Sequence, residues 1–462
     1  MSRPITAFLV LLLGACQPGD FPDLDSFASD LPLVVMDTHG VKVDRDRLWD
    51  EDDKREWAPV DATFIPLDDD GLARLAGPSE YAGRGGLHIR GSSSAEEYRK
   101  KSYTFETWDD MNQDQDVSLL GLPEEEDWVL HGPQSDKSLM RNALAYEWHR
   151  RLGRYSARTT FVELFVKDHS LGALDWNDYR GVYTFMEKIK RDDNRVDIAK
   201  LLPEHEREPE ISGGYLLRVD WLGDDESRFI DTDRCGCQFQ LESPEIDEIT
   251  GAQRVWLEAH LDDFEAVLLG DDFADPTRGY AAWIDVGSFV DYLLIQELAR
   301  NVDAYVLSTW LYKDRDGLLS MGPVWDFNGS LGNADYFEAW DVQGWHYENP
   351  EFPGDNPWAW CWWERLLQDP GFRAAVAQRW AGLRGDELSD TSLGSDIDGW
   401  ELQLEGAAHR NFERWDVLGE YVWPNDERSE DRQSYAEEVA YLRQWVRARA
   451  AWMDDELAGW EG

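Results

Sequence analysis

The sequence predicts an α+β fold, with strands in the first half of the chain and helices in the second. Three observations carry this prediction. Short β-rich runs recur up to about residue 320, helical patterns dominate from Trp362 onward, and neither an internal repeat nor a low-complexity block interrupts the order. Segregation of strands and helices along a chain is typical of α+β proteins, whereas α/β proteins alternate the two.

The strand candidates share apolar alternation and flanking turn residues. They cover residues 31–35, 62–67, 86–90, 101–105, 160–166, 181–186 and 213–219. A hairpin is expected where residues 310–312 and 318–320 are separated by a polar segment that ends in Gly317.

Three long helices are predicted from apolar stripes at helical spacing. Asp136 is expected to cap the first, which carries Leu144 and Trp148 on its stripe, and Asp285 is expected to cap the second, which ends near Ala299. The third covers residues 435–457.

Composition places the chain among folded proteins that do not bind nucleic acid. It has 462 residues, 42% of them hydrophobic, with 24 Trp, which is ample for a sizeable core. The net charge is 45 − 94 = −49, so binding through phosphate contacts to nucleic acid is excluded. In so acidic a chain any basic cluster is conspicuous.

The N-terminus predicts export and a lipid anchor. Residues 1–15 have a basic start, a short apolar run and small residues before Cys16, as in a bacterial lipoprotein signal peptide. We expect a lipid on Cys16 and a polar tether over residues 16–30. This places the protein in the bacterial cell envelope, at the outer membrane or cell surface. The alternative is an ordinary signal peptide with an incidental cysteine.

The remaining cysteines predict one disulfide. In an oxidising compartment either Cys235 or Cys237 is expected to bridge Cys361. No His or second Cys pair accompanies Cys235 and Cys237, so a zinc site is disfavoured.

Two aspartates carry the strongest chemical signal. Asp303 follows the apolar helix that ends near Ala299, and Asp326 follows the predicted hairpin, in Asp326-Phe327. A helix, an Asp-bearing loop, a hairpin and Asp-Phe is the order in which protein kinases present a catalytic base and a magnesium ligand.

Several segments together resemble the CotH family of spore-coat-type atypical kinases. The resemblance covers most of residues 31–390, and its pieces follow in order. They are Ile89-Arg90-Gly91-Ser92-Ser93-Ser94, Tyr98-Arg99-Lys100-Lys101, Asp136-Lys137-Ser138-Leu139-Met140-Arg141-Asn142, Tyr179-Arg180-Gly181-Val182-Tyr183, Glu187-Lys188, Gly213-Gly214-Tyr215, Asn301-Val302-Asp303 and Pro323-Val324-Trp325-Asp326-Phe327.

The resemblance implies a reduced protein-kinase-like fold with a β-rich N-terminal lobe and a helical C-terminal part. We expect the kinase-like domain to cover residues 31–385 and a helical extension, residues 386–462, to pack on it. It also implies transfer of phosphate from ATP, with Mg²⁺ or Mn²⁺, to Ser or Thr of an extracytoplasmic protein.

The basic segment from Arg90 to Lys101 is the candidate phosphate site. Backbone amides and hydroxyls from Gly91 through Ser94 are suited to bind phosphates. The alternative is a solvated basic turn, and alternation does not decide between Lys100 and Lys101. The family pattern favours Lys101. The expected nucleotide-binding residues are Arg90, Gly91, Ser92, Ser93, Lys101 and Glu187.

Glu147 lies on the apolar stripe of its helix and needs a cationic partner there. In protein kinases this partner is a lysine from the neighbouring strand, which here would be Lys101. Arg141 or a plain pair within the helix is the alternative.

Asp303 is expected to act as the base and Asp326 to hold Mg²⁺. The alternative for Asp303 is an ordinary turn residue at a helix end. Kinases place a metal-binding Asn five residues after the base, where this chain has Ser308, a poorer ligand. Asn328 is the expected substitute. The rival functions are a non-catalytic pseudokinase-like scaffold or adhesin, which Ser308 favours, and a carbohydrate-binding wall protein. The latter rests on Trp358, Trp360, Trp362 and Trp363, for which core packing is the more common role.

Overall fold

The computed structural model describes residues 24–44, 57–220, 229–349 and 359–460. The signal peptide, Cys16 and the start of the tether lie outside the described residues. The end of the expected tether lies within the described residues. There Phe27 is buried, and its ring contacts Phe165 and Tyr179. Residues 24–30 therefore belong to the folded body, because an apolar side chain among them has a place in the core.

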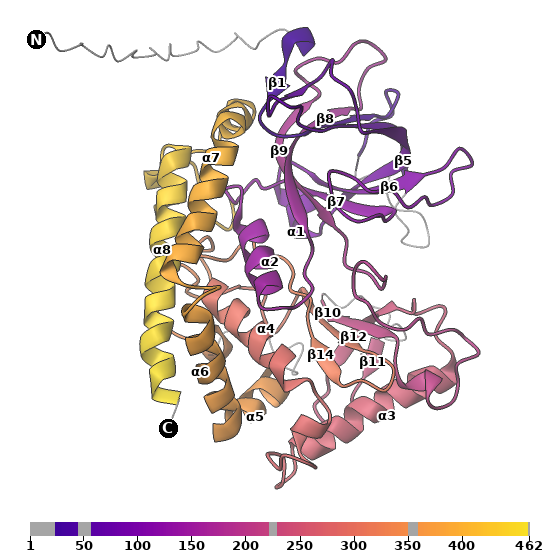
Figure 1. Ribbon diagram of the computed structural model, residues 1–462, viewed down its shortest axis with the longest axis vertical. Helices are drawn as coiled ribbons and strands as arrows, with labels where there is room; N and C mark the ends of the chain where they lie inside the picture. The colour runs from indigo at the N-terminus through magenta and orange to yellow at the C-terminus, as the bar shows by residue number, and fades with distance from the viewer. Residues whose placement is uncertain (1–23, 45–56, 221–228, 350–358, 461–462) are drawn as a thin grey trace, which may run out of the picture.

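The N-terminal part is a closed β-barrel (Figure 1). Its strands, in spatial order, are β2 (Leu33–Asp37), β3 (Ala58–Ile65), β5 (Tyr81–Arg90), β6 (Ser102–Trp108), β7 (Asp127–His131), β9 (Tyr179–Glu187) and β8 (Thr159–Lys167). All neighbours are antiparallel except β2 and β8, whose parallel pairing closes the barrel.

Alternation along the strands fills the barrel interior. Leu87 and Ile89 of β5, and Tyr103 and Phe105 of β6, belong to one apolar cluster with Val162 of β8. Because side chains two residues apart face the same side of a strand, the residues between them point outward. This parity decides where the residues at the end of β5 and the start of β6 point.

A second sheet lies beyond the barrel. Its strands, in order, are β11 (Phe229–Asp231), β12 (Gln238–Ser243), β10 (Tyr215–Val219), β13 (Thr309–Lys313) and β14 (Leu319–Met321). The predicted hairpin is confirmed as β13 and β14. A two-stranded pair, β1 (Ala28–Ser29) with β4 (Ala73–Arg74), lies near the N-terminus.

The helices gather along one flank and below the second sheet (Figure 1). They are α1 (Ser93–Glu97), α2 (Arg141–Arg151), α3 (Gly251–Leu268), α4 (Val286–Ala299), α5 (Glu364–Leu367), α6 (Pro370–Arg384), α7 (Asp390–Arg414) and α8 (Tyr435–Leu457). The mixed α+β class is confirmed, with a β-rich N-terminal part and a helical C-terminal part. None of the helices in the described residues has the length and apolarity needed to cross a bilayer.

Helix starts follow capping chemistry, with one correction. Asp285 caps α4 as expected, and its side chain accepts a hydrogen bond from the Ser288 N–H. Asp136 does not cap α2, which begins later, at Arg141, because Leu139 has a left-handed φ of 66°. The Asp136 carboxylate instead accepts from the Arg141 N–H at 2.8 Å and from its guanidinium at 2.6 Å.

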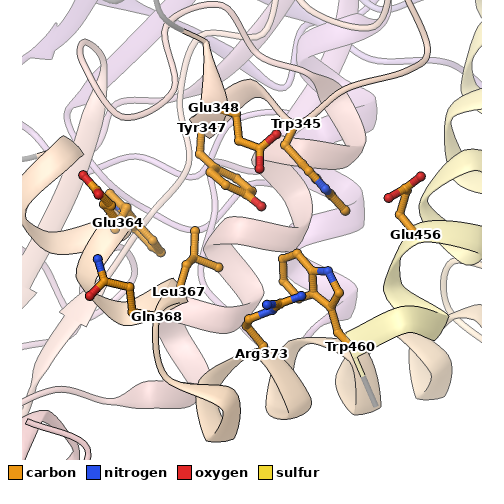
Figure 2. A pocket seen from close by; sticks show the side chains of 10 residues that line it. Trp345, Tyr347, Glu348, Glu364, Leu367, Gln368, Arg373, Glu456 and Trp460 are labelled. Carbon is orange, nitrogen blue, oxygen red and sulfur yellow. The ribbon is translucent and has the colours of Figure 1, made fainter. Parts of the chain in front are cut away.

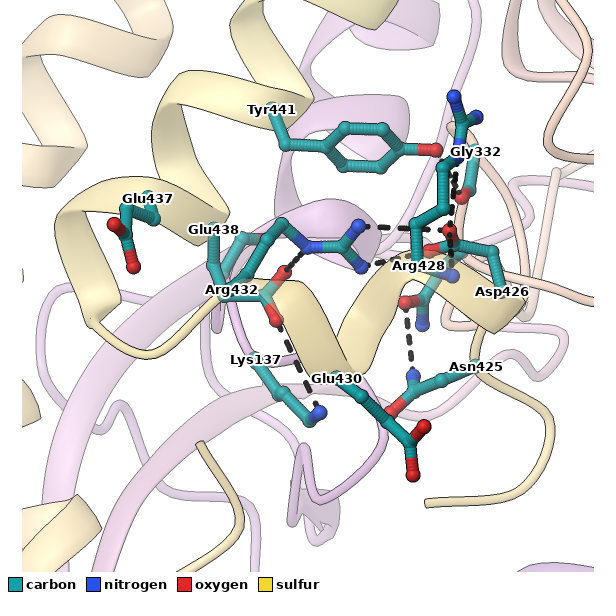
Figure 3. Close-up of polar contacts among 12 residues, drawn as sticks. Lys137, Gly332, Asn425, Asp426, Arg428, Glu430, Arg432, Glu437, Glu438 and Tyr441 are labelled. Carbon is teal, nitrogen blue, oxygen red and sulfur yellow. Dashed lines mark hydrogen bonds and ion pairs between the residues drawn. The ribbon is translucent and has the colours of Figure 1, made fainter. Parts of the chain in front are cut away.

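A buried ion network anchors α8 to the rest of the molecule (Figure 3). Arg432 donates to Glu438 at 2.8 Å and to Asp426 at 2.7 Å, and the Lys137 ammonium lies 3.9 Å from Glu438. Asn425, beside Asp426, donates to the Ser135 carbonyl at 2.7 Å. The C-terminal segment thus reaches the loop that precedes α2.

The disulfide prediction is confirmed as Cys235–Cys361, and Cys237 is a buried free thiol. Trp362 and Trp363 are buried in the main core, so they serve packing rather than a sugar platform. The side chains of Trp358 and Trp360 lie outside the described part of the chain.

Candidate functional site

Asp303 and Asp326 are held by loops that two helices fix. Asp303 lies in the turn after α4, where its N–H donates to Asn301 Oδ1 at 3.3 Å. The N–H of Asp326 donates to the Tyr146 hydroxyl at 3.2 Å, and that of Phe327 to Asn142 Oδ1 at 2.5 Å. Helix α2 therefore positions the Asp326 loop, in which Asp326 adopts a left-handed φ of 60°.

The two carboxylates share one electrostatic environment. Burial raises the pKa of Asp326 to about 6; Asp220 also raises it and Arg90 partly offsets the rise. Burial raises the pKa of Asp303 well above its usual value, with the charges of Asp326 and Asp220 adding to the effect. Both side chains are half-buried. Concentrated negative charge of this kind is typical of functional clefts.

Asp220 is the site residue that sequence reasoning missed. It follows β10, one residue beyond Val219, which pairs with Thr309 of β13. Ser308 precedes Thr309, so Asp220 and Ser308 lie at the same end of two neighbouring strands. The available signal was a carboxylate directly after a buried strand, in Arg218-Val219-Asp220.

Arg90 is a cation whose charge acts on Asp326. It is the last residue of β5, on the outward parity, and its guanidinium lies 5.3 Å from the ring centre of Trp325, next to Asp326. Gly91 follows with a φ of +99°, and a Cβ there would lie 2.3 Å from Ser94 Oγ, so the turn requires glycine. Ser92 and Ser93 are exposed at the start of α1.

Tyr98 directly follows α1 and lies near the two aspartates. Its hydroxyl donates to Ser135 Oγ at 2.9 Å. Its pKa is raised, first by burial and then by the charges of Asp326 and Asp303, despite the bond to Ser135. The two ends of the segment from Arg90 to Tyr98 are thus close enough to the aspartates for their charges to interact.

Lys101 lies elsewhere. It shares the inward parity of Tyr103, lines a cavity at the barrel mouth with Arg180 and Arg414, and its ammonium donates to the Ala95 carbonyl at 2.7 Å. Lys100 is buried, with its ammonium donating to Asn411 Oδ1 at 2.7 Å and to the Val182 carbonyl at 2.5 Å. Burial lowers the pKa of Lys100 well below its usual value.

Glu147 and Glu187 are held by arginines. Glu147 accepts from Arg150 at 2.5 Å and from Arg151 at 3.0 Å, on its own helix. Burial acts to raise its pKa, but these two bonds outweigh burial and lower it. Glu187 is buried and accepts from Arg158 at 2.6 Å. Of the partners considered for Glu147, the structure therefore shows the pair within its own helix. The Glu147 side chain is 28% exposed and lies beside two arginines.

Ser308 directly precedes β13, and Asn328 is the second residue after Asp326. Ser308 is half-buried with a left-handed φ of 49°, at the start of β13. Asn328 is half-buried, and its carbonyl accepts from the Asn333 amide at 2.7 Å.

The chain matches the family model described as CotH kinase protein over residues 87–453. It belongs to the CotH family. No curated protein matches the chain. The CotH match begins in β5 and ends within α8, so it takes in the acidic cleft, Arg90 and most of the C-terminal helices. Membership of the CotH kinase family indicates a kinase-like function.

An aromatic cavity of about 680 Å³ lies away from these residues, between α6 and the end of α8 (Figure 2). Trp345, Tyr347 and Trp460 surround it, with Glu348 and Glu456 at its edge. Arg373 stacks on Trp460, 4.6 Å from its ring centre. Trp363, one of the four tryptophans on which the carbohydrate alternative rests, also lines this cavity.

Proposed function

We propose that this CotH protein transfers the γ-phosphoryl group of ATP to a Ser or Thr hydroxyl of an extracytoplasmic protein. The observation that supports it is the electrostatic coupling of Asp303 and Asp326 to each other, to Asp220 and to Arg90 within a kinase family domain. Phosphoryl transfer asks a protein mainly for positioning and for charge.

Asp303 is the proposed base. Its carboxylate would orient the acceptor hydroxyl and take its proton as the oxygen attacks phosphorus. Burial raises the pKa of Asp303 well above its usual value, and a carboxylate with a raised pKa accepts a proton more readily than an ordinary one. Arg90 would neutralise phosphate oxygens, in the part that Lys101 was expected to play.

The donor set fits Mg²⁺ or Mn²⁺. Asp326 and Asp220 offer carboxylate oxygens, Asn328 an amide oxygen and Ser308 a hydroxyl, and hard divalent cations prefer oxygen. Asp220 and Asp326 are not in any of the groups of three or more acidic, His or Cys residues whose ligand atoms lie within 4.8 Å of one another in the described part of the chain. Mg²⁺ keeps several waters and shares its ligands with phosphates, so a bound nucleotide would supply the remaining ligands. When bound, the ion would offset charge on the transferring phosphoryl group.

The disulfide supports an extracytoplasmic location. Structural disulfides persist in oxidising compartments, and Cys235–Cys361 joins segments 126 residues apart. A lipid on Cys16 would hold the enzyme at the bacterial envelope and place its protein substrates there.

The experiment is phosphoryl transfer by the purified chain from labelled ATP, with Mg²⁺ or Mn²⁺, to itself and to envelope protein. Asp303→Asn and Asp326→Asn should each lower incorporation by about 10²-fold or more. Asp247→Asn, an exposed aspartate outside the cleft, is the matched control and should leave it unchanged. Equal labelling by wild type and both cleft variants contradicts the kinase proposal.

The second candidate is a non-catalytic scaffold, which Ser308 in place of the kinase Asn favours. A scaffold would bind ATP, with an affinity reduced in Asp326→Asn, and transfer no label to any protein. Replacing Ser308 by Asn then distinguishes the kinase from the scaffold. An active enzyme keeps or gains phosphoryl transfer, whereas a scaffold still transfers no phosphate.

A further inference from the structure

A basic cavity lies at the mouth of the barrel, where β5 ends and β6 begins. It encloses about 360 Å³. Ile89 and Tyr103, from the apolar interior of the barrel, line it on one side. Arg180 of β9 and Arg414, the last residue of α7, line it on another. The cavity is thus built by elements distant in sequence.

The charge of this cavity opposes that of the whole protein. The chain carries −49, yet the described residues that line the cavity include more basic than acidic side chains. The basic ones are Lys42, Arg99, Lys101, Arg180 and Arg414, and the acidic ones are Asp44 and Asp168. Against the global field, so local an excess of positive charge indicates an anion-binding site rather than a solvated face.

Carboxylates at ion-pair distance offset some of this positive charge. Arg180 pairs with Asp168 at 2.9 Å, and Lys42 pairs with Asp44. Arg414 is held by a carbonyl and an indole: its Nε donates to Tyr179 O at 3.0 Å, and its guanidinium lies 4.6 Å from the Trp415 ring centre.

The guanidinium groups also act on one another. Burial lowers the pKa of Arg414, and the neighbouring charges of Arg180 and Arg99 lower it further. Arg99 itself is exposed at the rim. An anion placed among the three would relieve this repulsion. Guanidinium groups are suited to phosphate because their planar forks donate two parallel hydrogen bonds.

We propose that the basic cavity binds a phosphate-bearing small molecule. Arg99, Arg180 and Arg414 surround the phosphate, and Ile89 and Tyr103 contact the less polar remainder. The described residues that line the cavity do not include Asp303, Asp326, Asp220 or Arg90. The proposal therefore stands whether or not the cleft transfers phosphate.

The test is titration calorimetry of the full chain with glycerol 3-phosphate, in EDTA and at fixed ionic strength. Without divalent cations the acidic cleft repels the probe, so binding reports the basic cavity. Arg99→Gln should weaken binding about tenfold, and Arg99→Gln with Arg414→Gln about 100-fold, as expected for one and two charge-assisted hydrogen bonds. Arg447→Gln, an exposed arginine of α8, is the matched control.

Equal affinity in wild type and Arg99→Gln, or no binding at millimolar probe, overturns the proposal. Because Arg99 is exposed, its replacement keeps the test valid even if loss of Arg414 impairs folding. Asp326→Asn should bind the probe as wild type does; tighter binding in that variant, which lacks one repelling carboxylate, would assign the anion to the site of Asp303 and Asp326 instead. A parallel titration with inorganic phosphate separates sources: weaker binding than glycerol 3-phosphate supports an organic ligand, and tighter binding contradicts it.

Discussion

Asp220 and Ser308 each stand one residue beyond the last paired position of β10 and β13, Val219 opposite Thr309. The strand register thus brings a carboxylate beside the position where kinases carry a metal-binding Asn. Asp220 also acts electrostatically on both Asp303 and Asp326. We infer that a carboxylate from a neighbouring strand compensates for the serine.

The first prediction concerns Asp220 and the divalent cation. Asp220→Asn should weaken Mn²⁺ binding about tenfold or more, because it removes one charged oxygen ligand. Calorimetric titration with Mn²⁺ in the absence of nucleotide measures this directly. Asp247→Asn should bind Mn²⁺ as wild type does. Unchanged affinity in Asp220→Asn would remove this residue from the metal site.

The second prediction concerns stability and pH. The pKa of Asp326 is about 6 in the folded protein against an ordinary 3.8, so the folded state binds this proton more tightly than the unfolded state. Its contribution favours folding below about pH 4 and is lost as pH rises through about 6. Asp326→Asn should therefore be more stable than wild type at pH 7.5, by about 1–2 kcal/mol after solvent screening.

Urea unfolding at pH 4 and pH 7.5 tests this, and the gain should shrink at the lower pH. Asparagine tolerates the left-handed φ of 60° at this position, so the backbone is kept. A variant less stable than wild type at pH 7.5 would contradict the raised pKa. A gain of equal size at both pH values would show that charge is not its cause.

Much of the fold was predictable because alternation and capping are local. The β13–β14 hairpin, the Asp285 cap and the span of α8 follow from neighbouring residues alone. Closure of the barrel could not be predicted in this way, because it depends on parallel pairing of β2 with β8, which is far away in sequence. Strand ends moved for the same reason: pairing extends β5 back to Tyr81, beyond its apolar run.

The residues of the candidate site show the same difference between local and long-range information. Asp303 and Asp326 were found because their order along the chain carries a chemical meaning. Asp220 was missed because its place depends on the β10–β13 register. The choice between Lys100 and Lys101 required the inward face of β6, which only the closed barrel defines. Arg90, on the outward parity, is a basic residue of this segment whose charge acts on Asp326.

The third prediction separates Glu147 from catalysis. Because Glu147 pairs with Arg150 and Arg151, Glu147→Gln should retain phosphoryl transfer within about twofold and lose less than about 1 kcal/mol of stability. Asp396→Asn is the contrasting variant. Asp396 joins α7 to α2 through two bonds from Arg151, both 2.7 Å, and one from Trp148 at 3.0 Å. Its loss should cost about 2 kcal/mol in urea unfolding. A large fall in transfer by Glu147→Gln would restore its role as an orienting carboxylate.

The fourth prediction concerns the buried network of Figure 3. Arg432 lies between Asp426 and Glu438, both buried, and burial raises the pKa of Glu438 despite the charges of Arg432, Arg141 and Lys137. Arg432→Met should cost about 3–5 kcal/mol, because it leaves two buried carboxylates short of a cation. Urea unfolding at pH 7.5 measures the loss.

Acid should relieve part of this cost, since a protonated carboxyl needs no counter-charge. The loss caused by Arg432→Met is therefore expected to be smaller at pH 5 than at pH 7.5. Arg428→Met removes an exposed arginine 3.9 Å from the same Asp426 and should change stability by less than about 0.5 kcal/mol.

Because Asn425 donates to the Ser135 carbonyl and Ser135 accepts from Tyr98, the Arg432 variant should also lose phosphoryl transfer before it unfolds. Full transfer by a variant destabilised to this extent would show that the C-terminal segment supports the fold without shaping the cleft.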